Sequence, residues 1–225
     1  MKRKQAIVLR SIYRKLNDHF GDLHWWPGET SFEIIIGAIL TQNTAWRNVE
    51  IAVRRLKNRR VMHTRSLFLL PDSELASLIR PAGFFRVKAA RLKSFLHFLH
   101  HRYGGSLKRM FGTETPLLRE ELLAVKGIGP ETADSILLYA GGRPIFVVDA
   151  YTRRILSRHG MIASDARYDE IQELFMASLP NEKSLFGQYH ALFVETGKTF
   201  CRKVPHCTDC PLRNPAFHPP CLPEH

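Results

Sequence analysis

Hydrophobic side chains recur every three to four residues along most of the chain, which is the spacing of one face of an α-helix. The pattern runs through residues 34–39, 49–56, 75–79 and 89–99. Short segments that contain Pro or Gly separate these stretches, at residues 27–28, 71–72, 81–83, 104–105 and 141–142. Because such segments interrupt regular structure, the pattern predicts an all-α fold of about ten helices.

Two short segments refine this prediction. Residues 144–148, Pro-Ile-Phe-Val-Val, form a strand-like run. The run is short and single and has helical patterns on both sides, so we expect a buried extended connector rather than part of a sheet. Residues 71–74, Pro-Asp-Ser-Glu, predict a helix start with an acidic first turn and a capping side chain.

The chain has 225 residues and a net charge of +12, and its composition is that of a globular protein. The longest apolar stretch, residues 34–40, is too short to span a bilayer, and no apolar signal region follows the basic N-terminus. We therefore expect a cytoplasmic protein, associated with the nucleoid if it is bacterial. The first 142 residues carry +11 of the net charge, with basic clusters at residues 54–60 and 86–93. This excess indicates a polyanionic partner.

A glycine hairpin, Lys126-Gly127-Ile128-Gly129, lies between two short predicted helices within residues 122–140. Glycine permits backbone with φ > 0 and close approach of a ligand, and Pro130 suits the first turn of the second helix. Backbone amides at such a helix start bind anions such as a DNA phosphate. A Gly-x-Gly sequence alone usually marks only a turn. Followed by Thr132-Ala133 and an apolar helix, it predicts a helix-hairpin-helix element that binds DNA.

Asp149 follows the Val-Val run about 20 residues after the hairpin, where it also suits the N-cap of a helix. The hairpin, the Gly/Pro-rich link and this Asp together resemble the active-site unit of the endonuclease III superfamily of DNA glycosylases. The resemblance extends from Phe32 to Cys221. It implies two α-helical domains with a DNA groove between them, in a monomer that acts on double-stranded DNA containing a damaged base. Asp149 would then be catalytic, stabilising an oxocarbenium-like transition state and orienting or deprotonating water.

The resemblance also implies DNA-binding residues and domain bounds. Residues 40–44, Leu-Thr-Gln-Asn-Thr, match the family's Gln-containing loop, whose Gln side chain fills the gap left by an extruded base. The residues implied to contact DNA are Gln42, Asn43, Lys126, Gly127, Ile128, Gly129 and Thr132. A helical domain of residues 27–142 would end in the hairpin, and residues 1–26 with 143–225 would form a discontinuous second domain. Further candidates for the pocket or groove are His24, Phe85 and His190.

The chain's four cysteines lie within its last 25 residues, at Cys201, Cys207, Cys210 and Cys221. Two disulfides are disfavoured without a secretory signal, because thiols stay reduced in the cytosol. Four thiolates can hold tetrahedral zinc or a [4Fe–4S] cluster. The resemblance favours the cluster, with a structural role in a loop of residues 201–221. The spacing C-x5-C-x2-C-x10-C departs from the family's usual C-x6-C-x2-C-x5-C, which alters the loop rather than the ligands.

The position two residues after the second hairpin glycine separates two kinds of glycosylase. Bifunctional relatives have a Lys there that attacks the sugar as a Schiff-base nucleophile, whereas this chain has Glu131. Because a carboxylate cannot form an imine, we expect a monofunctional glycosylase without AP lyase activity. Glu131 is a second catalytic candidate that would position water or contact the base, and the alternative is a purely electrostatic role beside the helix dipole.

Three tryptophans lie close in sequence to these motifs: Trp25 and Trp26 precede Pro27, and Trp46 comes four residues after Gln42. N-alkylated purines are cationic, and aromatic rings attract cations with about 0.5–2 kcal/mol for each contact. Trp-Trp-Pro with Leu-Thr-Gln-Asn-Thr-Ala-Trp is similar to the 3-methyladenine DNA glycosylase branch of the superfamily. The leading hypothesis is therefore removal of 3-methyladenine-like alkylated purines, with Trp25, Trp26, Pro27 and Trp46 in the base pocket.

Three alternatives remain open at the level of sequence. A uracil or thymine mismatch glycosylase would also lack the lysine, but it would need hydrogen bonds to a neutral pyrimidine edge. An endonuclease III-like glycosylase for oxidised pyrimidines would need a lysine nucleophile from another position. A non-catalytic hairpin module would bind DNA without releasing a base.

Overall fold

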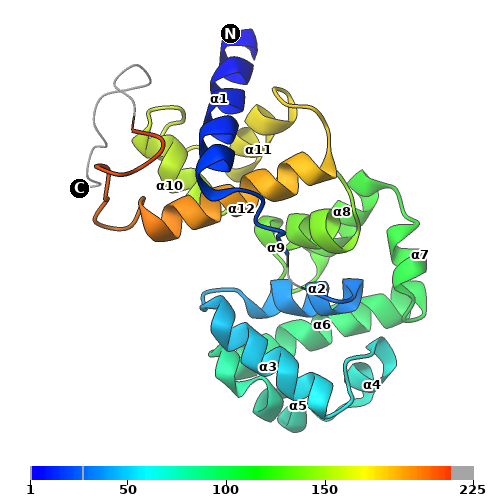
Figure 1. The fold of residues 1–225 in the computed structure, drawn as a ribbon. Coiled ribbons are helices and arrows are strands. Elements are labelled where there is room, and N and C mark those ends of the chain that lie inside the picture. Colours follow the sequence, from blue (N-terminus) through cyan, green and yellow to red (C-terminus); the bar gives the residue numbers. More distant parts are fainter. Residues whose placement is uncertain (1, 27, 214–225) are drawn as a thin grey trace. The chain divides into compact units, whose positions relative to one another are not determined.

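A computed structural model describes residues 2–26 and 28–213 of the chain. Every regular element in this part is helical, which confirms the all-α prediction (Figure 1). The elements are α1 (Lys2–Phe20), α2 (Ser31–Leu40), α3 (Trp46–Asn58), α4 (Thr64–Leu69), α5 (Asp72–Leu78), the 3-10 turn η1 (Arg80–Ala82), α6 (Phe85–Tyr103), α7 (Leu107–Phe111), α8 (Thr115–Ala124), α9 (Pro130–Ser135), the π-helical turn η2 (Ile136–Ala140), α10 (Ala150–Arg158), α11 (Tyr168–Met176) and α12 (Lys183–Thr199). None of these helices is both long and apolar enough to cross a membrane.

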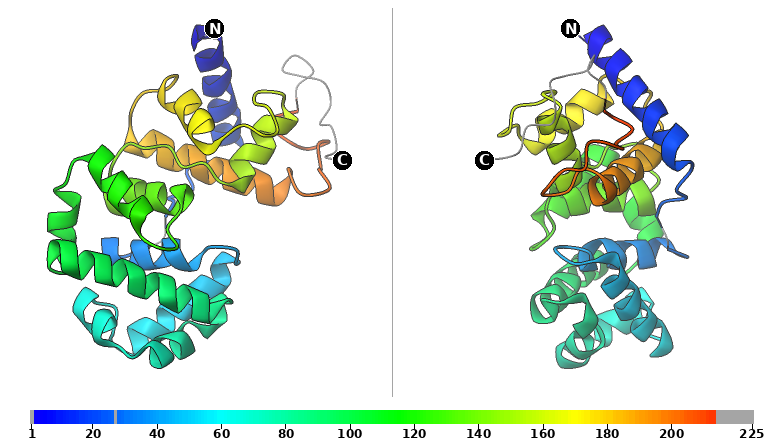
Figure 2. Two further views of the ribbon diagram at one scale, coloured as in Figure 1. Left: turned by 180° about the vertical axis from the view of Figure 1, so that it is seen from behind. Right: turned by 60° about the vertical axis from the view of Figure 1, so that its left-hand side comes forward.

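The described residues form two compact units. We call residues 26–143 the hairpin unit, and the described residues of 1–25 and 144–225 the aspartate unit. In the hairpin unit, α2 is apolar on nearly all sides, so it must be covered by other elements to leave water. It packs against α3, α6, α9 and η2, and its neighbours can be followed in Figure 2. The core of this unit therefore forms around α2.

Two lysines of α6 lie inside the hairpin unit rather than on its surface. Lys88 is 1% exposed, and its Nζ donates hydrogen bonds to the carbonyls of Leu40 at 2.9 Å and Ala82 at 2.6 Å. Lys93 donates to the carbonyl of Phe68 at 2.8 Å. Because the last carbonyls of a helix lack partners within the helix, these lysines cap the ends of α2 and α4. The expectation that their basic cluster faces a polyanion was wrong for both residues.

In the aspartate unit, α12 packs against both α1 and α10 (Figure 1). Its inner face joins an aromatic core of fully buried side chains: Phe146, Phe175, Phe186, Tyr189 and Phe193. Phe146 and Phe175 stack in parallel, with ring centroids 3.8 Å apart. The Tyr189 hydroxyl donates to the carbonyl of Leu9 on α1 at 2.8 Å. Packing and this buried hydrogen bond therefore set the position of α12 in the unit.

The strand-like run of residues 144–148 is an extended connector, as predicted. It belongs to no strand, and residues 145–148 are buried. The predicted helix start at residues 71–74 is confirmed by α5, which begins at Asp72, but the predicted capping side chain was wrong. Pro71 occupies the N-cap position and has no side-chain acceptor, so no side-chain capping bond forms there.

Candidate active site

Asp149 caps the first turn of α10. Its backbone is extended, with φ −113° and ψ −177°, and its Oδ1 accepts a hydrogen bond from the amide of Thr152 at 2.7 Å. The buried connector before it ends at this point, so the carboxyl group lies at a helix N-terminus, where the helix dipole favours negative charge. The predicted N-cap position of Asp149 is confirmed.

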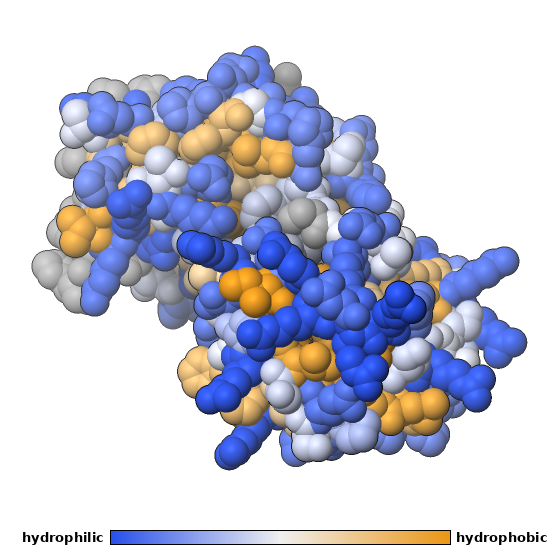
Figure 3. Space-filling view, turned by 60° about the horizontal axis from the view of Figure 1, so that its bottom comes forward, coloured by the Kyte–Doolittle hydropathy of each residue, from blue (hydrophilic) through white to orange (hydrophobic). Residues whose placement is uncertain are grey.

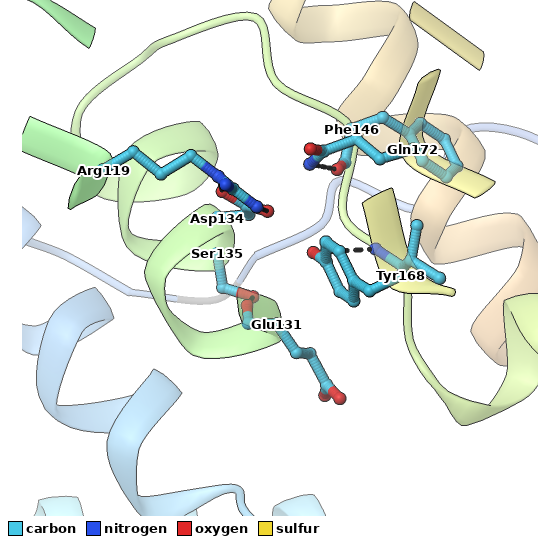
Figure 4. A network of polar contacts seen from close by, with 8 residues as sticks. Arg119, Glu131, Asp134, Ser135, Phe146, Tyr168 and Gln172 are labelled. Carbon is cyan, nitrogen blue, oxygen red and sulfur yellow. Dashed lines mark hydrogen bonds and ion pairs between the residues drawn. The ribbon is translucent and has the colours of Figure 1, made fainter. Parts of the chain in front are cut away.

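Two hydrogen bonds from α11 hold the connector that leads to Asp149 (Figure 4). Gln172 donates from Nε2 to the carbonyl of Phe146 at 2.6 Å, and the amide of Val148 donates to the hydroxyl of Tyr168 at 3.3 Å. Gln172 is buried, so water does not compete strongly for its bond. The backbone just before Asp149 is thus fixed from the side by a helix.

The Asp149 carboxyl group is buried beside a histidine. Asp149 is 9% exposed, and its Oδ2 lies 3.5 Å from Nε2 of His190, a 5% exposed residue of α12. Burial raises the pKa of Asp149, but the hydrogen bond and charge of His190 and the bonds from Thr152 lower it. The net effect is a pKa below the ordinary value for an aspartate. Asp149 is therefore a carboxylate at neutral pH and can stabilise positive charge or accept a proton.

The hairpin joins α8 to α9, as the sequence predicts. Gly127 has a φ of +92°, and a Cβ at this position would lie 2.3 Å from Cγ of Arg91. Glycine is required there for both reasons. Pro130 occupies the first turn of α9, and Lys126 and Gly129 are exposed. A Cβ added at Gly129 would meet no atom within 4 Å, so a ligand can approach the backbone at this point.

Two residues that the resemblance implied to contact DNA are buried in the hairpin unit. Ile128 is 4% exposed, and its amide donates to the carbonyl of Val125 at 3.0 Å. Thr132 is 7% exposed. Both side chains stabilise the hairpin, and neither presents its surface to a ligand. Asn43, in contrast, is exposed and has a left-handed backbone with φ +54°.

Gln42 is bonded to the hairpin. Its Nε2 donates to the carbonyl of Gly127 at 3.2 Å and to Oγ1 of Thr132 at 2.9 Å. Its Oε1 accepts a hydrogen bond from the guanidinium of Arg91. The amide therefore uses its donor group and its acceptor group within the unit. To fill a gap in DNA, Gln42 must exchange these bonds for new ones.

Glu131 lies in the first turn of α9, where an acidic side chain interacts favourably with the helix dipole. It is exposed, and its carboxylate points away from the Arg119–Asp134 pair in Figure 4. That pair joins α8 to α9 through two hydrogen bonds of 2.7 and 3.1 Å, and Ser135 donates to the carbonyl of Glu131 at 2.7 Å. The helices around the hairpin are thus braced, while the Glu131 carboxylate remains accessible.

Trp26 and Trp46 lie together in the hairpin unit, with ring centroids 5.2 Å apart in an edge-to-face arrangement. Tyr139 packs on Trp26 at 5.0 Å. Gly37 of α2 makes room for these rings, because a Cβ there would lie 3.3 Å from Cη2 of Trp46. Both tryptophans are half-buried, and the buried Nε1 of Trp46 has no hydrogen-bond partner among residues 2–26 and 28–213. We call Trp26, Trp46 and Tyr139 the aromatic cluster.

The other residues predicted for the base pocket are not part of this cluster. Trp25 belongs to the aspartate unit, where Nζ of Lys198 lies 5.2 Å from its ring centroid. Pro27 lies outside the described residues. Two of the four predicted pocket residues, Trp26 and Trp46, are therefore brought together by the structure.

Cys201, Cys207 and Cys210 form no disulfide with one another, and Cys221 lies outside the described residues. In the described part of the chain, no three His, Cys, Asp or Glu side chains gather closely enough to hold a metal ion. The donor set itself suits an iron–sulfur cluster, because thiolates are the ligands of such clusters. Nη1 of Arg158 also lies 3.5 Å from Sγ of Cys201, where its positive charge stabilises a thiolate.

Two residues of the hairpin unit were not identified as functional candidates from the sequence. Arg91 counted only as part of a basic cluster, yet it contacts both Gln42 and Gly127. Phe84 is 70% exposed and has a left-handed backbone with φ +44°, which is uncommon for a bulky residue. Exposed hydrophobic groups lie among hydrophilic ones on the face shown in Figure 3. The only sequence signal for Phe84 is its position after the turn of residues 81–83.

Comparisons with known proteins agree with this geometry. Residues 36–181 match the family described as "HhH-GPD superfamily base excision DNA repair protein". A protein of Methanocaldococcus jannaschii, described provisionally as a DNA repair glycosylase, is 46% identical over 95% of this chain and 97% of its own length. The endonuclease III of Thermotoga maritima is 30% identical over 81% of each chain.

Among solved structures, the 3-methyladenine DNA glycosylase of H. pylori bound to 1,N6-ethenoadenine is similar, with a TM-score of 0.72 and 30% identity. The likeness covers 88% of this chain and 97% of that one. The resemblance to the endonuclease III superfamily is thereby confirmed. The chain belongs to the HhH-GPD superfamily of base excision DNA repair proteins and is a DNA glycosylase of that superfamily.

Proposed function

We propose that this protein is a monofunctional DNA glycosylase that removes alkylated, 3-methyladenine-like purines from double-stranded DNA. The observation that carries the choice of base is the aromatic cluster of Trp26, Trp46 and Tyr139. Electron-rich ring faces attract a cationic purine more strongly than a neutral base. The buried Nε1 donor of Trp46 adds a polar group that a bound base can satisfy. The 30% identity to a 3-methyladenine DNA glycosylase supports the same choice.

In the proposed reaction, Asp149 acts as a carboxylate. The bond between C1′ of the deoxyribose and the purine nitrogen breaks, and its electron pair leaves with the base. The Asp149 charge stabilises the positive charge that develops on the sugar. A water oxygen then bonds to C1′, and its proton passes to the Asp149 carboxylate. The products are the free purine and an abasic site. The lowered pKa of Asp149 keeps the group in the ionised form that this reaction requires.

Glu131 supports hydrolysis rather than lyase chemistry. It stands where bifunctional relatives have the nucleophilic lysine, and a carboxylate forms no imine with the sugar. Its exposed position in the first turn of α9 leaves it able to position water or contact the base. We assign it this secondary role and assign the proton transfer to Asp149.

The hairpin unit would make most of the contacts with DNA. The exposed backbone at Gly129 and the side chain of Lys126 suit a phosphate. Phe84 is exposed in a strained backbone, and apolar side chains presented in this way enter base steps and unstack them. Gln42 and Asn43 would approach the strand at the extruded base. We propose that the protein does this as a monomer.

We further propose that Cys201, Cys207, Cys210 and Cys221 hold a [4Fe–4S] cluster that stabilises the C-terminal loop. The cluster would take no part in base release, and its contribution would be structural. An absorbance spectrum of the purified protein distinguishes an iron–sulfur cluster from zinc, the other candidate. A broad band near ~400 nm is expected for iron–sulfur, and a colourless protein that contains zinc would refute the cluster.

The proposed function is tested by single-turnover release of bases from three matched duplexes. The first duplex contains methylated purines, the second a U·G mismatch and the third an oxidised pyrimidine. The Asp149→Asn variant of the protein is the inactive control. We expect release of methylated purines by the wild type alone, and no borohydride-trapped adduct. Release of uracil or oxidised pyrimidine without methylated purine would refute the choice of base. A trapped adduct would refute hydrolysis, and binding without any release would support a non-catalytic module.

A further inference from the structure

Asp149 and His190 form a buried pair, and the proposed reaction assigns a role to Asp149 but none to His190. A carboxyl group as buried as Asp149 is normally held in its neutral form by the loss of hydration. The proposed reaction needs the ionised form. The charge must therefore be stabilised by groups that face it inside the aspartate unit.

The two oxygens of Asp149 have different neighbours. Oδ1 accepts from the amide of Thr152 at 2.7 Å, while Oδ2 lies 3.5 Å from Nε2 of His190. Rotation of the carboxyl group about its Cβ–Cγ bond would lengthen both contacts. The pair therefore sets the orientation of the carboxylate as well as its charge.

The position of His190 is fixed by the packing of α12. The neighbouring Tyr189 is fully buried and bonded to Leu9 on α1, and Phe186 and Phe193 lie in the same aromatic core. His190 itself is 5% exposed. A side chain held this firmly loses little further entropy when its Nε2 faces the carboxylate at 3.5 Å.

The other charged groups on the packed elements point elsewhere. On α10, Arg153 donates to the carbonyl of Ala166, and Arg154 donates to the carbonyl of Cys201 at 2.7 Å. On α12, Lys198 lies over the ring of Trp25. Arg158 of α10 donates to the carbonyls of Arg202 and Lys203, and Glu195 of α12 lies 3.9 Å from Nζ of Lys198. On α11, Glu170 accepts from Arg167, and the Tyr168 hydroxyl accepts from the amide of Val148. In the described part of the chain, His190 is thus the titratable side chain that lies within ion-pair distance of the Asp149 carboxylate.

We propose that His190 is a positioning residue for base release, which holds the Asp149 carboxylate in its ionised form and in one orientation through its Nε2–H. This inference rests on the proposed function, because it assumes that Asp149 is the catalytic carboxylate. His190 touches neither the sugar nor the base in this scheme. It acts only through Asp149.

The test is the pH dependence of single-turnover release from methylated duplex DNA, measured from pH 5 to pH 8. In the wild type, Asp149 stays ionised over this range, so the rate shows no acidic limb from this group. In His190→Phe, burial remains but the donor is lost, and we expect the pKa of Asp149 to rise by about two to three units, into the assayed range. The rate should then fall about tenfold between pH 8 and pH 5.

His190→Gln retains an N–H donor at a similar distance and should restore much of the wild-type profile. Phe193→Leu is the matched control, because it disturbs the packing of α12 without touching Asp149. A structural role for His190 predicts that His190→Phe behaves like Phe193→Leu, with a rate lowered equally at every pH. That result would overturn the proposal, as would a His190→Gln profile that matches His190→Phe.

A second measurement does not depend on activity. In protein labelled with 13C at the aspartate carboxyl carbons, the Asp149 signal is identified by its absence in Asp149→Asn. Its titration is followed in the wild type, His190→Phe and Phe193→Leu. A higher pKa of Asp149 in His190→Phe than in the wild type, with no change in Phe193→Leu, supports the proposal. An unchanged pKa in both variants refutes it. If Asp149→Asn releases bases normally, the proposed function fails, and the titration still decides whether His190 controls Asp149.

Discussion

Asp149 has two physical roles that a pair of substitutions separates. Its Oδ1 caps α10 through the amide of Thr152, and its charge is required in the proposed reaction. Asparagine keeps an oxygen that can accept the same hydrogen bond but has no charge. Alanine has neither. We expect Asp149→Asn and Asp149→Ala to lose base release equally, while only the alanine variant loses the cap.

The magnitudes follow from these contacts. Loss of an N-cap side chain lowers the free energy of unfolding by about 0.5–2 kcal/mol, whereas Asn and Asp are nearly equivalent caps. For a chain of this size, 1 kcal/mol changes Tm by about 2–4 °C. Loss of a general base lowers a rate by about 10²–10⁴. We therefore expect at least a ~100-fold loss of release in both variants, and a lower Tm for Asp149→Ala than for Asp149→Asn.

The comparison of stability should be made at pH 7. The pKa of Asp149 is lowered on folding, so the stabilisation that comes from its charge is complete above the pKa of the unfolded chain. It is lost as the pH falls through the lower pKa of the folded state. Stability is measured by urea unfolding and release by single-turnover assay. If Asp149→Asn retains more than a tenth of the wild-type rate, the charge is not required and the mechanism is refuted. If Asp149→Ala is as stable as Asp149→Asn, the cap contributes nothing measurable.

Three further substitutions test other parts of the structure. Gln42→Ala removes the bonds to Gly127 and Thr132 and leaves Arg91 without its acceptor, so we expect a loss of about 1–3 kcal/mol in urea unfolding and weaker binding to duplex DNA in fluorescence anisotropy. An unchanged unfolding midpoint would contradict this. Phe84→Gly should raise stability by about 0.5–1 kcal/mol, because glycine tolerates the left-handed backbone, while it weakens binding to duplex DNA several-fold. Equal binding by both proteins would show that Phe84 does not enter the DNA. Arg158→Met should lower the iron content and the absorbance near ~400 nm, because it removes a positive charge beside Cys201, and full iron retention would exclude this role.

The long helices were predictable because the information for each is local. The apolar repeat of residues 49–56 and 89–99 corresponds to buried faces of α3 and α6. The twelve α-helices of the described residues exceed the expected ten or so, because α4 and α7 are only six and five residues long. A helix this short has too few turns for its periodicity to be recognised.

The buried lysines show where the same reasoning failed. In sequence, Lys88 and Lys93 belong to a basic cluster, and a lysine in such a cluster is normally solvated. In the structure, each donates to carbonyl groups at the end of another helix. Whether such carbonyls lie within reach depends on the packing of helices that are distant in sequence. No local pattern contains that information.

For the candidate site, the sequence alone determined the hairpin, the position of Asp149 at a helix start and the presence of Glu131 in place of a lysine. These features depend on residue types and on spacings of a few residues, and backbone geometry at that range is set locally. The tertiary structure alone decided that Gln42 is bonded to Thr132, 90 residues away, and that Asp149 faces His190 on α12. It also decided that the pKa of Asp149 is lowered. These properties arise from burial and from hydrogen bonds between distant segments, which exist only once the helices have packed.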